Sequence, residues 1–163
     1  MTTRRLRAVR PVELDERGVE LVAFCGHCGL APHPEVAQRT RVCGHCGFGL
    51  VLRARSDVAP RTDEPFLVVD STLSVCAVSA AAEGLLGVDE TSAVNKHIVD
   101  FLVPADANAS SADNLLVLLV AAASGPGAPR TAVVRPREEF GVRFRARIGA
   151  CGPPHAALLV LAG

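Results

Sequence analysis

The chain has 163 residues, with 17 Lys and Arg against 17 Asp and Glu, so its formal net charge at pH 7 is zero. This length allows one medium domain or two small ones, and the charge balance excludes a whole-chain field that attracts nucleic acid or membranes. There is no Trp or Tyr and there are six Phe, so aromatic platforms for stacking a base or a flavin are scarce.

The first 18 residues are charged and contain no apolar run after their arginines, so they do not form a signal peptide. The most apolar segment, residues 115–123, is too short to cross a bilayer. We therefore expect a cytoplasmic location without membrane contact. In that reducing compartment, paired cysteines are metal ligands or redox groups rather than structural disulfides.

Residues 19–55 hold four of the six cysteines in two copies of CGHCG, with the spacing C-x2-C-x14-C-x2-C. Apolar runs at 19–24 and 48–52 predict a strand on each side. Two residues between cysteines let both sulfurs turn toward one point, and four thiolates without an open position are typical of structural zinc. The alternative, two redox dithiols, requires that each pair open a helix in a thioredoxin-like βαβ unit, which the pattern lacks.

The stretch CGHCGLAPHPEVAQRTRVCGHCG, flanked by the two strands, resembles the zinc ribbon family over residues 19–55. The resemblance implies one structural zinc ion, with iron as the alternative, and the ligands Cys25, Cys28, Cys43 and Cys46. His27 and His45 lie inside the pairs, and we expect their rings to point away from the metal. A unit of this size buries too little surface to fold alone, so we expect the metal to supply its fold.

Four arginines on or after the predicted hairpin are candidates for phosphate contacts: Arg39, Arg41, Arg53 and Arg55. The plainer interpretation of these charges is a solvated face.

Residues 56–64 are polar with a proline and predict a linker. A hairpin then follows, with strands at 66–70 and 73–78 around a turn at Ser71 and Thr72. Ser79 is placed to cap a helix with Glu83 reciprocating, and Gly87 is placed to end it.

The remaining elements mix short helices and strands. Residues 98–102 predict a helical turn stopped by Pro104, and Ser110 or Ser111 opens a helix that ends near Gly125. Strands are predicted at 131–135, 142–148 and 156–161, the second half-buried and the last fully apolar.

The stretch PFLVVDSTLSVCAVSAAAEGLLGVDETSAVNKHIVDFLVPAD, with the later helix and three strands, resembles the PAS domain family over residues 65–163. The resemblance implies an α+β fold: a five-stranded antiparallel sheet with helices on one face, able to hold a small ligand or to pair with another copy. Asn95-Lys96-His97 lacks the cysteine of light-sensing relatives, and the long helix lacks the histidine of haem-binding ones. The ligand stays open, and an interior filled by Leu and Val is the alternative.

Cys76 and Cys151 are the two cysteines outside the pairs. Inert or buried thiols are the first interpretation, and a redox sensor is the second.

The residues contain no Ser/His/Asp set, no phosphate loop and no second metal cluster, so we expect a protein without enzymatic activity. The sequence predicts a regulatory protein in which a structural zinc ribbon, residues 19–55, precedes a PAS-like domain for small-molecule sensing or dimerisation. Its expected partners are another protein and a second copy of the chain. A transcription regulator that binds nucleic acid through the ribbon is the alternative.

Overall fold

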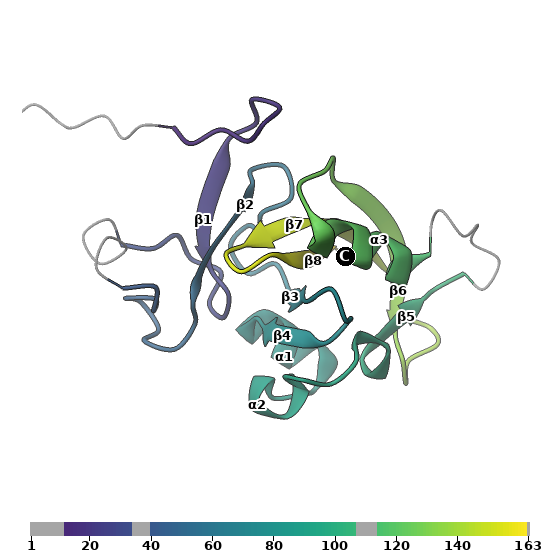
Figure 1. Ribbon diagram of the computed structural model, residues 1–163. Helices are drawn as coiled ribbons and strands as arrows, with labels where there is room; N and C mark the ends of the chain where they lie inside the picture. Colours follow the sequence, from purple (N-terminus) through teal and green to yellow (C-terminus); the bar gives the residue numbers. More distant parts are fainter. Residues whose placement is uncertain (1–11, 34–39, 107–113, 163) are drawn as a thin grey trace, which may run out of the picture.

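The computed structural model describes residues 12–33, 40–106 and 114–162. Within these residues, short strands outnumber helices (Figure 1). In chain order the elements are β1 (Leu21–Cys25), β2 (Val51–Arg55), β3 (Phe66–Val69), β4 (Val75–Val78), α1 (Ala80–Leu86), α2 (Glu90–Ala93), the 3-10 helix η1 (Ile98–Asp100), β5 (Leu102–Pro104), α3 (Leu115–Ser124), β6 (Arg130–Pro136), β7 (Phe144–Gly152) and β8 (Ala156–Ala162).

All the strands join one antiparallel sheet, in which β4, β3, β8 and β7 lie side by side. The far edge of β7 has two neighbours, because β7 is long enough to serve both. Its first part pairs with β6, and Cys151 and Gly152 near its end pair with β2. The predicted α+β class is confirmed, but within the described residues the sheet has eight strands rather than five, because β1, β2 and β5 join it.

The sheet buries a separate apolar cluster on each face. Leu67 and Val69 of β3 contact the helices, whereas Phe66 and Val68 of the same strand belong to the other cluster. Strand β8 alternates in the same way, which explains why its sequence is apolar throughout. The second cluster, whose described members include no helical residue, consists of Phe24, Leu52, Ala54, Val58, Ala59, Phe66, Val68, Cys151, Ala156, Leu158 and Val160.

The first helix forms largely as its sequence predicts. The Ser79 side chain accepts a hydrogen bond from the Ala82 amide, and Gly87 is the C-cap. The expected reciprocal contact from Glu83 is wrong, because Glu83 Oε1 instead accepts from the Glu90 amide at 2.6 Å. This bond ties the middle of α1 to the start of α2.

Two other predictions need correction. Residues Leu102–Pro104 form strand β5 rather than part of a helical turn, and Pro104 is tolerated because β5 pairs only with β6. Helix α3 begins after Asn114, whose side chain accepts from the Leu116 amide. Ser110 and Ser111, the predicted caps, lie outside the described residues.

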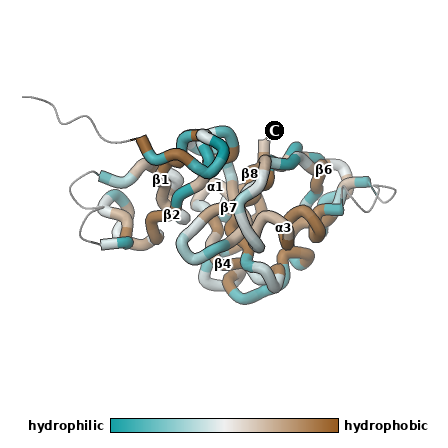
Figure 2. Tube along the Cα trace, turned by 45° about the horizontal axis from the view of Figure 1, so that its top comes forward, coloured by the Kyte–Doolittle hydropathy of each residue, from teal (hydrophilic) through white to brown (hydrophobic). Residues whose placement is uncertain are grey.

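Helix α3 is hydrophobic along its length (Figure 2). It still has only 10 residues, and none of the helices in the described segments is long and apolar enough to span a bilayer.

The segment assigned to a linker, residues 56–64, packs closely against the sheet. Val58 is fully buried, and a Cβ on Gly149 would come within 3.0 Å of its side chain. Arg147 of β7 donates to both carboxyl oxygens of Glu64, at 2.7 and 3.0 Å. The segment therefore fixes the first part of the chain to the sheet, and the exact domain boundaries stay a prediction.

Candidate metal centre

The four cysteines of the two pairs converge at the end of the β1–β2 hairpin where Cys25 pairs with Val51. Their sulfur atoms all lie within 4.8 Å of one another, with 3.7 Å between those of Cys25 and Cys46 and 3.8 Å between those of Cys28 and Cys43. A disulfide needs about 2.05 Å, whereas the edges of a tetrahedral zinc–thiolate site with bonds of about 2.3 Å measure about 3.8 Å. The donor set and its spacing therefore fit a metal such as zinc.

Each pair wraps its backbone around its first sulfur. The amide of His27 lies 3.4 Å from Cys25 Sγ, and the amide of His45 lies 3.3 Å from Cys43 Sγ. The turns close at Gly29 and Gly47, whose φ angles of 73° and 66° are ones that residues with a Cβ rarely adopt. Amides that point at sulfur stabilise the thiolate form, which is the form that binds metal.

Gly49 is a further requirement of the centre that the spacing of the cysteines does not reveal. A Cβ at this position would lie 2.4 Å from Cys25 Sγ and 2.8 Å from the His27 backbone nitrogen. The Gly49 amide also donates to Cys46 Sγ at 3.4 Å. The second pair therefore passes so close to the first that only glycine fits.

The thiol pKa values differ within the cluster. Burial raises the pKa of Cys25 well above its usual range, and it also raises the pKa of Cys28. For Cys46 burial acts in the same direction, but hydrogen bonds from the Gly49 and Phe48 amides outweigh it and lower the pKa to about 6. A metal cation in the cluster would offset the cost of ionising Cys25 and Cys28.

The two histidines inside the pairs contact other groups instead of the sulfurs. His45 Nε2 lies 3.1 Å from the Ala31 carbonyl oxygen. His27 Nδ1 lies 3.3 Å from Glu90 Oε2 on α2, and its ring packs edge-on against Phe48.

The first pair docks on the C-terminal part of the chain (residues 65–162). The Ala80 amide, at the start of α1, donates to the His27 carbonyl at 2.9 Å. The rings of Phe24 and Phe66 meet edge to face, with 5.6 Å between their centroids. The metal centre is thus built against the rest of the fold instead of standing apart from it.

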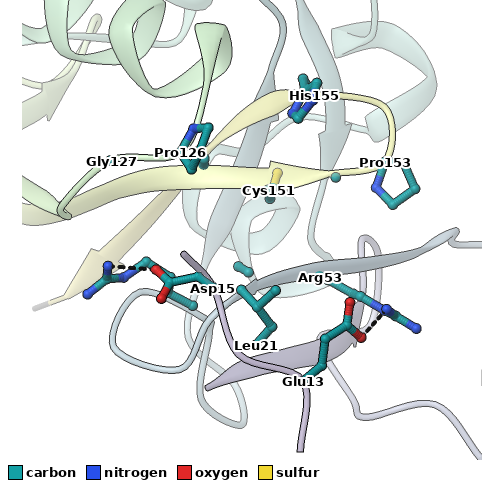
Figure 3. A pocket seen from close by; sticks show the side chains of 13 residues that line it. Glu13, Asp15, Leu21, Arg53, Pro126, Gly127, Cys151, Pro153 and His155 are labelled. Atoms are coloured by element: carbon teal, nitrogen blue, oxygen red, sulfur yellow. Dashed lines mark hydrogen bonds and ion pairs between the residues drawn. The ribbon is translucent and has the colours of Figure 1, made fainter. Parts of the chain in front are cut away.

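The arginines predicted to meet phosphates make contacts within the chain. Figure 3 shows Arg53 paired with Glu13, and Arg55 is held between Asp15 and Asp57 at 2.9 and 2.7 Å. Arg41 donates to the Pro153 carbonyl. Arg39 lies outside the described residues, so binding of nucleic acid through these four arginines stays a prediction.

The two remaining cysteines lie away from the cluster. Cys151 is buried in the second apolar cluster, and this burial raises its pKa to about 12. Cys76 is exposed, yet partial desolvation and the neighbouring Asp70 charge raise its pKa as well. Neither thiol has the lowered pKa that marks a reactive cysteine.

Among known proteins, a solved structure gives a partial match to this chain. No protein-family model matches the chain, and no curated protein matches it in sequence. Among solved structures, the chain is similar to the PAS domain of an HTR-like protein from Haloarcula marismortui, with a TM-score of 0.43 and 14% identity. The match covers 61% of this chain and 84% of that one.

Proposed function

We propose that the chain is a regulatory protein in which a structural zinc ribbon is built onto a PAS-like sensory domain. Cys25, Cys28, Cys43 and Cys46 would hold one zinc ion. The ion supplies a cross-link between β1 and β2, and four thiolate ligands leave no open position for a substrate. The proposed role is therefore not enzymatic.

The pairing of β2 with β7 is the observation that carries this proposal. Arg53 and Ala54 pair with Gly152 and Cys151, so the cysteine hairpin (residues 21–33 and 40–55) continues the sheet of the C-terminal part. β7 and β8 run from that junction under α3. A change in how the sheet packs can therefore alter the geometry of the hairpin, and the reverse holds equally.

We propose that the output is contact with another protein in the cytoplasm, and that a second copy of the chain is a further partner. Exposed Phe48, Leu50 and Val42 on the cysteine hairpin provide apolar surface for such contacts. The ion pairs of Arg53 and Arg55 support this choice over nucleic acid, because those charges are already neutralised within the chain.

Native mass spectrometry of the purified protein tests the proposal. It reports the metal content, any retained small molecule and the number of subunits in one experiment. The expected mass is that of the chain plus one zinc ion for each subunit. A metal-free chain with intact disulfides, or an iron centre, would contradict the proposed structural zinc site.

A further inference from the structure

A groove of about 720 Å³ lies where the cysteine hairpin meets the C-terminal part of the chain. One wall is the segment that follows the second cysteine pair, Phe48, Gly49 and Leu50, together with Gly26 of the first pair. The other wall combines Ala77 of β4 with Glu90 and Val94 around α2. The groove has the size of a small-molecule site.

On its sheet side, the groove lies on the face of the second apolar cluster. Val68, Leu52 and Ala156 line it, and all three are members of the second apolar cluster. The cluster under α1, α2 and α3 forms a separate interior on the opposite face. The groove is thus distinct from the first apolar cluster, although Glu90, Thr91 and Val94 around α2 border it.

Two large apolar side chains at the groove remain open to solvent. Phe48 is 57% exposed and Leu50 is 47% exposed. Both follow the second cysteine pair, so the metal-held turn sets their position. Exposed apolar side chains beside a concave surface are typical of a binding site.

The polar side chains that line the groove are acidic, apart from Thr91, His155 and the Cys76 thiol. Among the described residues that line it there is no Lys or Arg, whereas two are carboxylic acids, Asp70 and Glu90. Glu90 is already engaged, since its Oε1 accepts from the Val78 amide and its Oε2 lies beside His27. Asp70 Oδ1 accepts hydrogen bonds from the Thr72 and Ser74 amides, at 2.8 and 3.0 Å. Within the described residues, Asp70 Oδ2 accepts no hydrogen bond. It is therefore free to accept one from a ligand.

Burial alone would raise the pKa of Asp70, but its hydrogen bonds with Thr72 and Ser74 outweigh that effect and lower the pKa. The carboxylate is therefore ionised at neutral pH. Apolar walls with a fixed negative charge complement a ligand with an apolar body and a positive head.

We propose that this groove binds a small organic amine, whose apolar body lies against Leu50, Ala77 and Val94 and whose ammonium group meets Asp70. The inference deepens the proposed function, on which it rests, by naming the class of small molecule that the protein senses. Because the cysteine hairpin forms one wall, amine binding and metal binding are linked: each should strengthen the other.

The test uses the full zinc-loaded chain and a matched set of probes. 2-Phenylethylamine is titrated while methyl NMR shifts of Leu50, Ala77 and Val94 are followed, and neutral 2-phenylethanol and anionic phenylacetate serve as comparisons. The amine should bind at least about tenfold more tightly than the alcohol, a difference of about 1.4 kcal/mol, and phenylacetate should bind more weakly still.

Two variants separate the charge from the cavity. Asp70→Asn keeps the Oδ1 acceptor of the turn but removes the charge, so it should weaken the amine about tenfold and leave the alcohol unchanged. Ala77→Leu should block both probes by filling the groove. Asp100→Asn, a carboxylate that pairs with Arg137 and does not line the groove, is the matched control and should change neither.

Zinc content is measured on the same samples, so the two proposals can fail separately. One zinc ion per chain without amine binding at millimolar concentration overturns the groove and leaves the proposed metal site intact. Equal binding of amine and alcohol overturns the role of Asp70. A chain that binds the amine but holds no zinc overturns the proposed function instead.

Discussion

The cysteine hairpin and the helix-covered face belong to one sheet but are stabilised by different means. The hairpin buries few large apolar side chains and exposes Leu30, Val42, Phe48 and Leu50. The helix-covered face instead packs a continuous cluster in which Leu119, Ile148 and Leu159 are almost fully buried. A short hairpin with so little apolar burial needs a cross-link, and the metal proposed for the four converging thiols would provide it.

The largest expected effect comes from removing the cross-link. Cys43→Ser should abolish stoichiometric zinc binding and unfold the hairpin, since structural zinc contributes on the order of 10 kcal/mol in comparable small units. Metal content by mass spectrometry and thermal unfolding by circular dichroism measure the result. Cys76→Ser, at an exposed cysteine outside the cluster, is the matched control and should keep one zinc ion and the parental melting temperature. An equally stable Cys43→Ser protein would show that the cysteines do not stabilise the hairpin.

The second prediction concerns the helix-covered face of the sheet. Leu159→Ala removes a fully buried side chain of β8 under the helices, and should lower the free energy of unfolding by about 2–5 kcal/mol. Zinc stoichiometry should remain one at a temperature where the variant is folded. Val133→Ala on β6 is the control, because Val133 is 43% exposed and its loss should cost little. Loss of zinc together with an intact fold would reverse the proposed division between the regions.

A smaller effect should come from the close contact inside the metal centre. Gly49→Ala places a Cβ 2.4 Å from Cys25 Sγ, and should cost about 1–3 kcal/mol and weaken zinc binding. Gly84→Ala is the matched control: its Cβ meets nothing within 4 Å, and alanine favours helix α1 by about 1 kcal/mol. Competition with a chromogenic zinc chelator gives the relative affinities. Unchanged affinity in Gly49→Ala would mean that the two cysteine pairs lie farther apart than described.

The smallest effect concerns the segment between the regions. The hydrogen bonds from Arg147 lower the pKa of Glu64 below 4.5, so this pair stabilises the fold above about pH 4.5 and its contribution disappears as the pH falls through the lowered value. Glu64→Gln should cost about 1–2 kcal/mol near neutral pH and little at acidic pH. Urea unfolding at several pH values measures the difference. Glu138→Gln, at a 91% exposed side chain, is the control. A cost that is the same at every pH would contradict the ion pair.

The grouping of the four cysteines was predictable because the geometry within each pair is local. Two residues between cysteines dictate that both sulfurs face one point, and the left-handed turns at Gly29 and Gly47 follow from the same spacing. The need for glycine at position 49 was not predictable, because it arises from contact with Cys25 across the hairpin. The contact between Glu90 and His27 was not predictable either, because it joins residues far apart in the chain. Glu90 also lies in α2, which has only four residues and therefore no clear helical pattern in the sequence.

The fold was predictable where a sequence pattern is compatible with only one type of secondary structure. Ser79 and Gly87 bound a helix by backbone chemistry, and an apolar run such as 156–161 indicates a strand buried on both faces. The short apolar run at 102–104 fits both a strand and a turn, and its pairing with β6 decided between them. The pairing of β2 with β7 depends on the extra length of β7, and no pattern in residues 51–55 predicts β7 as the partner strand.

Hydrogen exchange of the chain before and after zinc removal tests the central claim most directly. The account predicts that chelation abolishes amide protection over Leu21–Cys25 and Val51–Arg55, while Ala156–Ala162 and α3 keep most of theirs. Added zinc should restore the hairpin. Equal protection of β1 and β2 with and without metal would contradict the account, because the hairpin would then be stabilised by its packing alone.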